Sequence, residues 1–209
     1  MAELLQPATH EDLGDILSNA ARNGSRLRIR GGGSKDAIGA PTPDVPTLDM
    51  QGFAGVVDYD PPELVLTARA ATPLVEIERL VASEGQMLAF EPFDHGPILG
   101  NRDRKATIGG IVAAGVAGPR RVSGGGTRDH VLGFEAASGD GTYFKAGSKV
   151  VKNVTGFDLS KLITGSWGRL VALTQVTLKV LPEPEVRQSL VLRGLDPKAA
   201  IEVMAQALG

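Results

Sequence analysis

The sequence predicts an α+β fold arranged in two lobes. Three observations support this prediction: short alternating segments typical of strands, amphipathic segments typical of helices between them, and an ordinary soluble composition of 42 % apolar and 22 % charged residues. Hairpin-type connections occur beside longer crossover connections, which argues against one doubly wound sheet. Only 4 % of the residues are aromatic, so the core must be built from Val, Ile, Leu and Ala.

The first lobe is predicted to span about residues 1–95. It opens with a helix over residues 10–23 that begins at Thr9, and a second helix follows Thr72-Pro73, runs through Ser83 and ends at Gly85. Strands are expected at residues 27–30, 47–50, 56–58, 64–70 and 86–90.

The second lobe is predicted to span about residues 105–185. It begins with an Ala/Gly-rich helical segment from Thr107 to Gly118-Pro119 and continues with a hairpin whose turn is Gly139-Asp140-Gly141. The hairpin strands lie at residues 131–138 and 142–146, a helix follows at 159–164, and a long strand is expected at 170–181. A strand at 188–193 and a helix at 197–208 are then read as the start of a further, truncated domain.

Charge and composition narrow the class of function. The net charge of −2 gives no reason to expect nucleic-acid binding, and the absence of cysteine excludes thiol catalysis and cysteine-held iron–sulfur clusters. The acidic N-terminus does not resemble a signal peptide, and the longest apolar run is too short to span a bilayer. We therefore expect a cytoplasmic protein without direct membrane insertion, and docking to a membrane partner stays open. No metal site is expected, because His10, His95 and His130 are not spaced as ligands and are interpreted as surface or loop residues.

Glycine is the unusual component, with 27 of 209 residues against a usual share of about 7 %. The first cluster, Arg30-Gly31-Gly32-Gly33-Ser34-Lys35, directly follows a predicted strand. Consecutive glycines allow backbone N–H groups to turn inward and cradle an anion, with Ser34 and Lys35 as further donors. A flexible hairpin turn is the alternative. The loop matches neither the dinucleotide fingerprint nor the Walker motif.

The second cluster is Thr107-Ile108-Gly109-Gly110, followed by small residues including Ala113 and Ala114. Thr107 can cap a helix whose first turn is made of glycines, so a phosphate could approach the positive helix end. The alternative is a helix that only packs closely. Nearby cations favour an anionic ligand, although they also suit a solvated face or a subunit-docking patch. They are Arg102, Arg104, Lys105, Arg120, Arg121 and Arg128.

A third stretch runs through residues 149–162 and is followed by Thr164-Gly165-Ser166-Trp167-Gly168. Its Lys, Asn and Asp residues would by themselves be interpreted as structural. Together, however, the three motifs resemble the FAD-binding domain of the vanillyl-alcohol-oxidase/p-cresol-methylhydroxylase (PCMH-type) superfamily. Residues 118–121, 128–133 and 149–168 look most like the E subunits of glycolate oxidases within it. The resemblance covers roughly residues 1–185.

The resemblance implies that FAD lies between the lobes, with its pyrophosphate held by the first two motifs. It places the adenine and ribose near residues 165–171, with Gly165, Gly168 and Val171 as contacts. It places Pro92, Arg128 and Asp129 at the border of the cofactor. The first loop carries no histidine or cysteine for a covalent flavin bond, so non-covalent FAD is expected. Gly115 stands where relatives often have asparagine, and Phe157 stands where they have tyrosine. By the resemblance, we expect this sequence to contain only the start of the family's cap domain, at residues 186–209.

The function implied is an FAD-dependent oxidoreductase subunit of a glycolate (2-hydroxyacid) oxidase complex. Its partners would be a homologous flavoprotein subunit and an iron–sulfur subunit, through which the chain would be peripheral at the inner membrane. No catalytic acid–base pair is identified from the residues. Two alternatives remain open: a non-catalytic scaffold subunit, and another FAD enzyme of this fold acting on alcohols or sugars.

Overall fold

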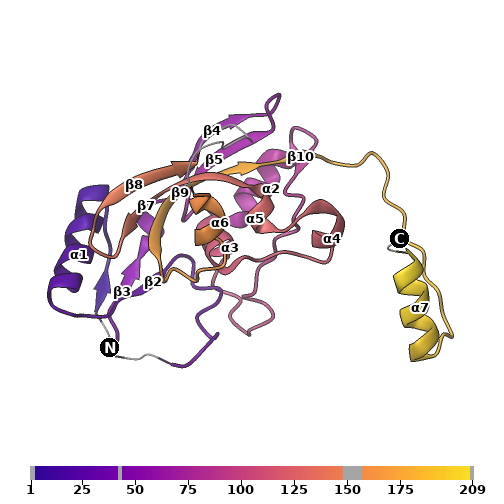
Figure 1. Ribbon diagram of the computed structural model, residues 1–209, viewed down its shortest axis with the longest axis horizontal. Coiled ribbons are helices and arrows are strands. Elements are labelled where there is room, and N and C mark those ends of the chain that lie inside the picture. Colours follow the sequence, from indigo (N-terminus) through magenta and orange to yellow (C-terminus); the bar gives the residue numbers. More distant parts are fainter. Residues whose placement is uncertain (1–2, 42–43, 148–156, 208–209) are drawn as a thin grey trace.

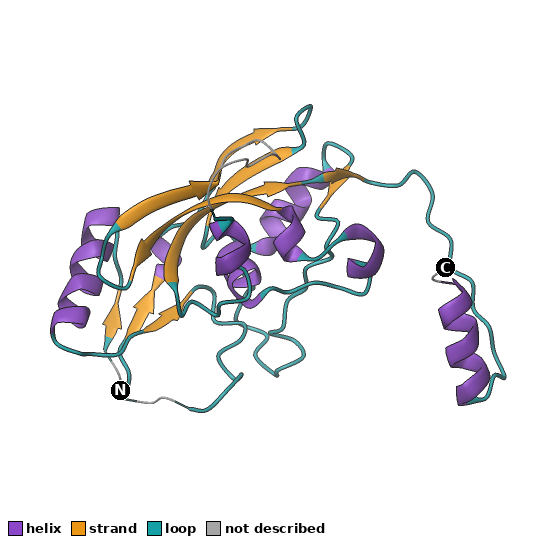
Figure 2. Ribbon diagram, viewed as in Figure 1, coloured by secondary structure: helices purple, strands orange, loops and turns teal. Residues whose placement is uncertain are grey.

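A computed structural model of the chain describes residues 3–41, 44–147 and 157–207. It confirms the α+β prediction, with helices and strands arranged in separate layers (Figures 1 and 2). The largest element is a five-stranded antiparallel sheet of order β4-β5-β9-β7-β8. Its strands are β4 (Val56–Asp60), β5 (Val65–Arg69), β7 (Val131–Ser138), β8 (Tyr143–Gly147) and β9 (Val171–Lys179). Because β5 pairs with β9 over its whole length, strands expected in the first lobe join those of the second.

A second, parallel sheet has the order β1-β3-β2. It consists of β1 (Leu4–Leu5), which the sequence did not predict, together with β2 (Arg28–Arg30) and β3 (Thr47–Asp49). A 3₁₀ turn, η1 (Met50–Gly52), follows β3 directly. Helix α1 (His10–Arg22) lies beside this sheet and contacts β7 of the larger one (Figure 1). The N-terminal segment therefore forms its own small layer.

Helix caps show where the sequence determined local structure. Thr9 forms the predicted cap of α1, since its side chain accepts from Asp12 N while the Asp12 carboxylate accepts from Thr9 N. Helix α2 (Leu74–Ala82) follows Thr72-Pro73 as predicted, and its cap residue, Pro73, makes no side-chain hydrogen bond. The Thr72 hydroxyl instead binds the backbone of Gly55 and Arg69, which fixes the turn after β5.

The remaining helices belong to the second half of the chain: α3 (Ile108–Ala114), α4 (Arg121–Gly124), α5 (Thr127–His130) and α6 (Leu159–Ile163). Helix α3 is shorter than predicted because Gly115, at φ 65°, ends it in the left-handed conformation. The hairpin turn before β8 is as predicted, with Gly141 at φ 88°. Contacts of α3 with β5 and β9, and of α6 with β7 and β8, cover one face of the large sheet.

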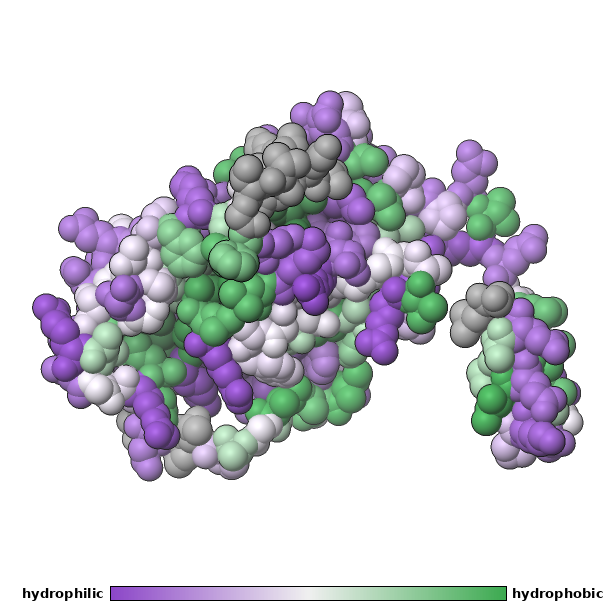
Figure 3. Space-filling model, viewed as in Figure 1, coloured by the Kyte–Doolittle hydropathy of each residue, from purple (hydrophilic) through white to green (hydrophobic). Residues whose placement is uncertain are grey.

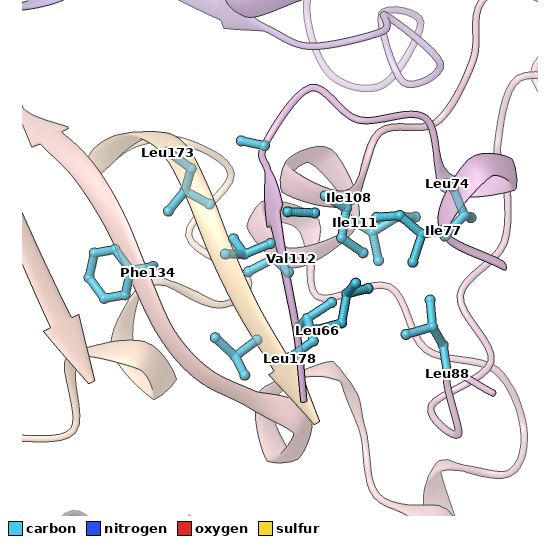
Figure 4. Close-up of a cluster of buried hydrophobic side chains, with 14 of the residues drawn as sticks. Leu66, Leu74, Ile77, Leu88, Ile108, Ile111, Val112, Phe134, Leu173 and Leu178 are labelled. Carbon is cyan, nitrogen blue, oxygen red and sulfur yellow. The ribbon is translucent and has the colours of Figure 1, made fainter. Parts of the chain in front are cut away.

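The main hydrophobic core lies between that face and helices α2 and α3 (Figure 4). Leu66, Ile108, Ile111, Val112 and Leu178 are fully buried in it. A smaller cluster around Leu13, Leu48 and Met50 includes Ala137 and Ala172, which are sequence neighbours of the main-core residues Ala136 and Leu173. Since neighbouring strand residues point to opposite faces, the α1 layer packs on the other face of the sheet. The small parallel sheet and helix α3 therefore lie on either side of the region where β9 begins, and the cavity described below forms there.

The end of the chain differs most from prediction. The strand expected at 86–90 is only β6 (Gln86–Met87), which pairs with β10 (Leu181–Pro182), and residues 188–193 form no strand. That segment has no neighbouring strand to complete its backbone hydrogen bonds, so alternation alone does not make it one. Helix α7 (Pro197–Ala207) forms as predicted and stands apart from the body, with exposed Ile201 and Met204 (Figures 1 and 3). No helix in the described part of the chain is both long and apolar enough to cross a membrane.

Candidate functional site

A cavity of about 290 Å³ lies between β2, the loop after it, α3 and the start of β9. Most of the residues predicted to form the site line this one cavity, although they come from three separate parts of the sequence. They are Arg30, Gly31, Gly32, Gly33, Ser34, Lys35, Thr107, Gly109, Gly110, Ala113, Ala114, Gly168 and Val171. The structure thus brings together the first motif, the second motif and the end of the third. Their role as cofactor contacts remains a prediction.

The glycines of the first loop allow two backbone segments to cross in close contact. A Cβ at Gly32 would lie 1.8 Å from the carbonyl oxygen of Lys105, and one at Gly31 would lie 2.6 Å from Oγ1 of Thr107. Gly33, at φ 76°, forms a parallel bridge with Lys105. Any side chain at position 32 would force the two segments apart, so glycine is required there by packing.

Helix α3 contributes differently from what its sequence predicts. The Thr107 side chain caps it by accepting from Gly110 N at 3.3 Å, as expected. The N–H groups of Ile108 and Gly109, however, donate to the carbonyl oxygens of Thr72 and Ala70 at 3.0 and 2.7 Å. Because these N–H groups already have partners, they are not available to a phosphate at the helix end. The alternative of a closely packed helix describes Gly109 better: a Cβ there would lie 2.6 Å from the Ala70 Cβ.

Arg30 provides buried positive charge in the cavity wall. Its Nη2 lies 3.0 Å from Oδ2 of the almost fully buried Asp49, and its Nη1 lies 3.8 Å from Oδ2 of Asp36. Its Nε is also buried but has no hydrogen-bond partner. A buried donor without a partner is costly, so Arg30 retains the capacity to bind an acceptor from a ligand in the cavity.

Lys35 lies at the end of the glycine loop and also lines the cavity. Burial lowers the pKa of its ammonium group, and the nearby charge of Asp94 opposes that shift. Asp94 is held by the N–H groups of Gly96 and Ala106, at 2.8 and 3.0 Å. An anionic ligand would supply the negative charge that a partly buried lysine favours. This end of the cavity therefore suits a phosphate group.

Five predicted site residues do not line the cavity. Ile108 is fully buried in the core, and the Gly165 N–H donates to Val112 O beside the cavity. Arg128 and Asp129 are exposed on α5, where the Asp129 carboxylate accepts from Gly126 N. Pro92 follows Glu91, which adopts φ 51°. The cofactor contacts that the resemblance assigns to Pro92, Arg128 and Asp129 would therefore lie outside this cavity.

Two of the cations between residues 101 and 128 contact nearby groups of the chain. Glu91 accepts from Arg120 N at 2.9 Å and lies 3.9 Å from Arg120 Nε, so this cation serves the local structure. Lys105 Nζ lies 3.4 Å from the Arg102 carbonyl oxygen.

The structure corrects the interpretation of His130, which was expected on the surface or in a loop. It is 1 % exposed, and its Nε2 lies 2.7 Å from Gly124 O. This contact joins α5 to the last residue of α4.

Several lining residues were not named as contacts by sequence reasoning: Arg28, Ile29, Asp36, Ile38, Met50, Ala70, Ala71, Trp167 and Leu173. Ala70, Ala71 and Met50 resemble ordinary core residues, so no sequence signal distinguishes them. Trp167 did carry a signal, since it is the single tryptophan and stands between two glycines. Residues 149–156 of the third motif lie outside the described residues. Among the residues described, no group of acidic or histidine side chains is arranged to hold a metal ion.

Comparison with known proteins adds an independent observation. A family model described as an FAD binding domain matches residues 1–147. The chain is 46 % identical to glycolate oxidase subunit GlcE of Escherichia coli over 174 residues, which are 83 % of this chain and 47 % of that protein. It is 28 % identical to subunit GlcD of Bacillus subtilis over 206 residues, or 98 % of this chain and 42 % of that protein.

Other similar proteins carry names that refer to other substrates. A D-lactate dehydrogenase of Archaeoglobus fulgidus is 28 % identical over 86 % of this chain and 39 % of its own length. Among solved structures, alkyldihydroxyacetonephosphate synthase superposes with a TM-score of 0.64 at 21 % identity, covering 88 % of this chain and 32 % of that one. The chain therefore spans about half, or less, of the length of these relatives.

Proposed function

Because the chain belongs to the FAD-binding domain family, which it matches over residues 1–147, we propose that it binds FAD non-covalently in the cavity between β2, α3 and β9. The observation that carries this proposal is the convergence of the glycine loop, the small residues of α3 and the start of β9 on one cavity. The family match identifies the cofactor, and the geometry identifies where this chain would hold it.

The residues present fit a dinucleotide. Gly31 and Gly32 line the cavity while packing closely against Thr107 and Lys105. The buried Nε of Arg30 lacks an acceptor, and Lys35 supplies a cation at the loop end. A diphosphate would provide the missing acceptor and the charge. No side chain in the loop is suited to a covalent flavin bond, which supports non-covalent binding. When bound, FAD would supply the redox chemistry, and the chain would bind and orient it.

We further propose that the chain is the FAD-binding subunit of a glycolate or related 2-hydroxyacid oxidase complex. The similarity to GlcE supports this assignment, and the similarities to GlcD and to D-lactate dehydrogenase support the substrate class. The partners would be a homologous flavoprotein subunit and an iron–sulfur subunit. Through them the chain would lie at the cytoplasmic face of a membrane.

Two measurements test this function in order. The purified chain, incubated with FAD and separated from free cofactor, should carry visible flavin absorption, and acid should release that flavin intact. Assembled with its partner subunits, the complex should show anaerobic bleaching of flavin on addition of glycolate or D-lactate. A chain that stays colourless would refute FAD binding. Bound flavin that no 2-hydroxyacid bleaches in the assembled complex would refute the oxidase assignment alone.

A further inference from the structure

The phosphate end of the cavity also contains a carboxylate that the proposed ligand does not explain. Asp36 lines the cavity, and its side chain is 28 % exposed. Its Oδ2 lies 3.8 Å from Arg30 Nη1 and would lie 3.0 Å from a Cβ at Gly33. The negative charge is therefore placed against the glycine loop, where it opposes the binding of an anion.

Support of Arg30 does not account for this carboxylate. Arg30 Nη2 already forms a closer ion pair, at 3.0 Å, with Oδ2 of the almost fully buried Asp49. The separation of 3.8 Å between Arg30 and Asp36 exceeds hydrogen-bonding distance, and a loose, partly exposed ion pair contributes little to stability. Asp36 is held beside the loop by a turn, in which its N–H donates to Gly33 O at 3.1 Å.

The cations at this end of the cavity are offset by carboxylates. Arg30 pairs with Asp49, the charge of Asp94 acts on Lys35, and Arg104 approaches Gly33 through its Cδ atom. The six charged side chains around the loop are Arg30, Lys35, Arg104, Asp36, Asp49 and Asp94. Their formal charges cancel. Such a balance suits a phosphate with a single charge better than one with two.

The charge on a phosphate depends on how it is bonded. In the diphosphate of FAD, each phosphate is joined to carbon on one side and to the other phosphate on the other, so each carries one negative charge. A terminal phosphate, as in ADP or FMN, carries about −1.5 to −2 at pH 7, because its second ionisation has a pKa of about 6. Since ADP is also part of FAD, contacts with the shared atoms cannot distinguish the two ligands.

We propose that Asp36 is a specificity-determining residue that repels terminal phosphates, so that the site accepts a diphosphate capped at both ends and rejects nucleotides that end in a phosphate. The inference rests on the proposed FAD binding and adds the residue that sets its selectivity. The Asp36 carboxylate lowers the affinity for any anion. It lowers the affinity for a terminal phosphate further, because that group brings a second charge while Asp49 and Asp94 already offset the nearby cations.

Asp36→Asn tests this proposal, because it removes the charge and keeps the shape of the side chain. Competition against bound FAD compares ADP, which ends in a phosphate, with ADP-ribose, in which a sugar caps the same diphosphate. ADP-ribose should displace FAD from the original chain at a lower concentration than ADP. In Asp36→Asn, ADP should gain about 3- to 10-fold in affinity relative to ADP-ribose. Asp36→Ser also removes the charge and should give the same change.

Asp103→Asn is the matched control, because Asp103 is exposed and lies outside the cavity lining. It should leave the ratio of the two affinities unchanged, and melting temperatures show that each variant is folded. If FAD binds but ADP matches ADP-ribose in the original chain, or gains nothing relative to it in both Asp36 variants, the inference is wrong and the proposed function stands. If the original chain does not bind FAD, both fail.

Discussion

The crossing of the glycine loop over the segment at Lys105 gives the most quantitative prediction. In Gly32→Ala the new Cβ would lie 1.8 Å from the Lys105 carbonyl oxygen, where real contacts require about 3.0 Å, so the backbones must separate by about 1.2 Å. The bridge between Gly33 and Lys105 and the contact of Gly31 with Thr107 would both be lost. Overpacking of this kind costs about 3 kcal/mol in unfolding free energy. For a chain of this length, the melting temperature should fall by about 6–12 °C.

Thermal unfolding followed by circular dichroism measures this effect, and calorimetry on the folded fraction should show FAD affinity reduced at least tenfold, equivalent to about 1.4 kcal/mol. Gly139→Ala is the matched control: a Cβ there meets nothing within 4 Å and the position does not require a left-handed φ. Its melting temperature and FAD affinity should remain those of the original chain. If Gly32→Ala melts within 2 °C of the original and binds FAD equally well, the close crossing does not exist as described.

Two further predictions concern the cations of the cavity wall. Arg30→Met leaves the buried carboxylate of Asp49 without its cation, so chemical denaturation should show the unfolding free energy lowered by about 3–5 kcal/mol. Adding Asp49→Asn to this variant should recover part of that loss. Equal stability of Arg30→Met and the original chain would contradict a buried ion pair between Arg30 and Asp49. Burial lowers the pKa of Lys35, and a diphosphate favours the protonated form, so FAD affinity should fall as pH rises through that lowered pKa, below the ordinary value of 10.5. FAD affinity measured across the alkaline range should no longer depend on pH in Lys35→Arg. Identical pH profiles for Lys35→Arg and the original chain would show that Lys35 does not contact the cofactor.

The local structure of this chain could be predicted where one or two residues determine it. Thr9 with Asp12 begins α1, Thr107 begins α3, and Gly139-Asp140-Gly141 makes the hairpin turn, because each acts through backbone groups close in sequence. That the first glycine loop follows a strand was likewise predictable, and its role as an anion cradle stays a prediction.

The predictions that the structure corrects depended on contacts between segments distant in the sequence. The carbonyl groups of Ala70 and Thr72 occupy the first-turn N–H groups of α3, and no pattern around Gly109 could reveal that. The role that the resemblance gives Pro92, Arg128 and Asp129 at the border of the cofactor stays a prediction, because these residues are not among those that line the cavity. Which loops enclose a given cavity is set by the packing of layers. Trp167 is different, because its place between two glycines of the third motif was visible in the sequence.

The central claim is that this chain holds one FAD in the cavity formed by the glycine loop, α3 and the start of β9. Calorimetric titration of the cofactor-free chain with FAD tests it most directly, with Gly32→Ala as the comparison. The account predicts a single saturable site with one FAD per chain, and markedly weaker binding when the loop crossing is disrupted. Absence of a saturable site, or binding that Gly32→Ala leaves unchanged while its melting temperature falls, would contradict it.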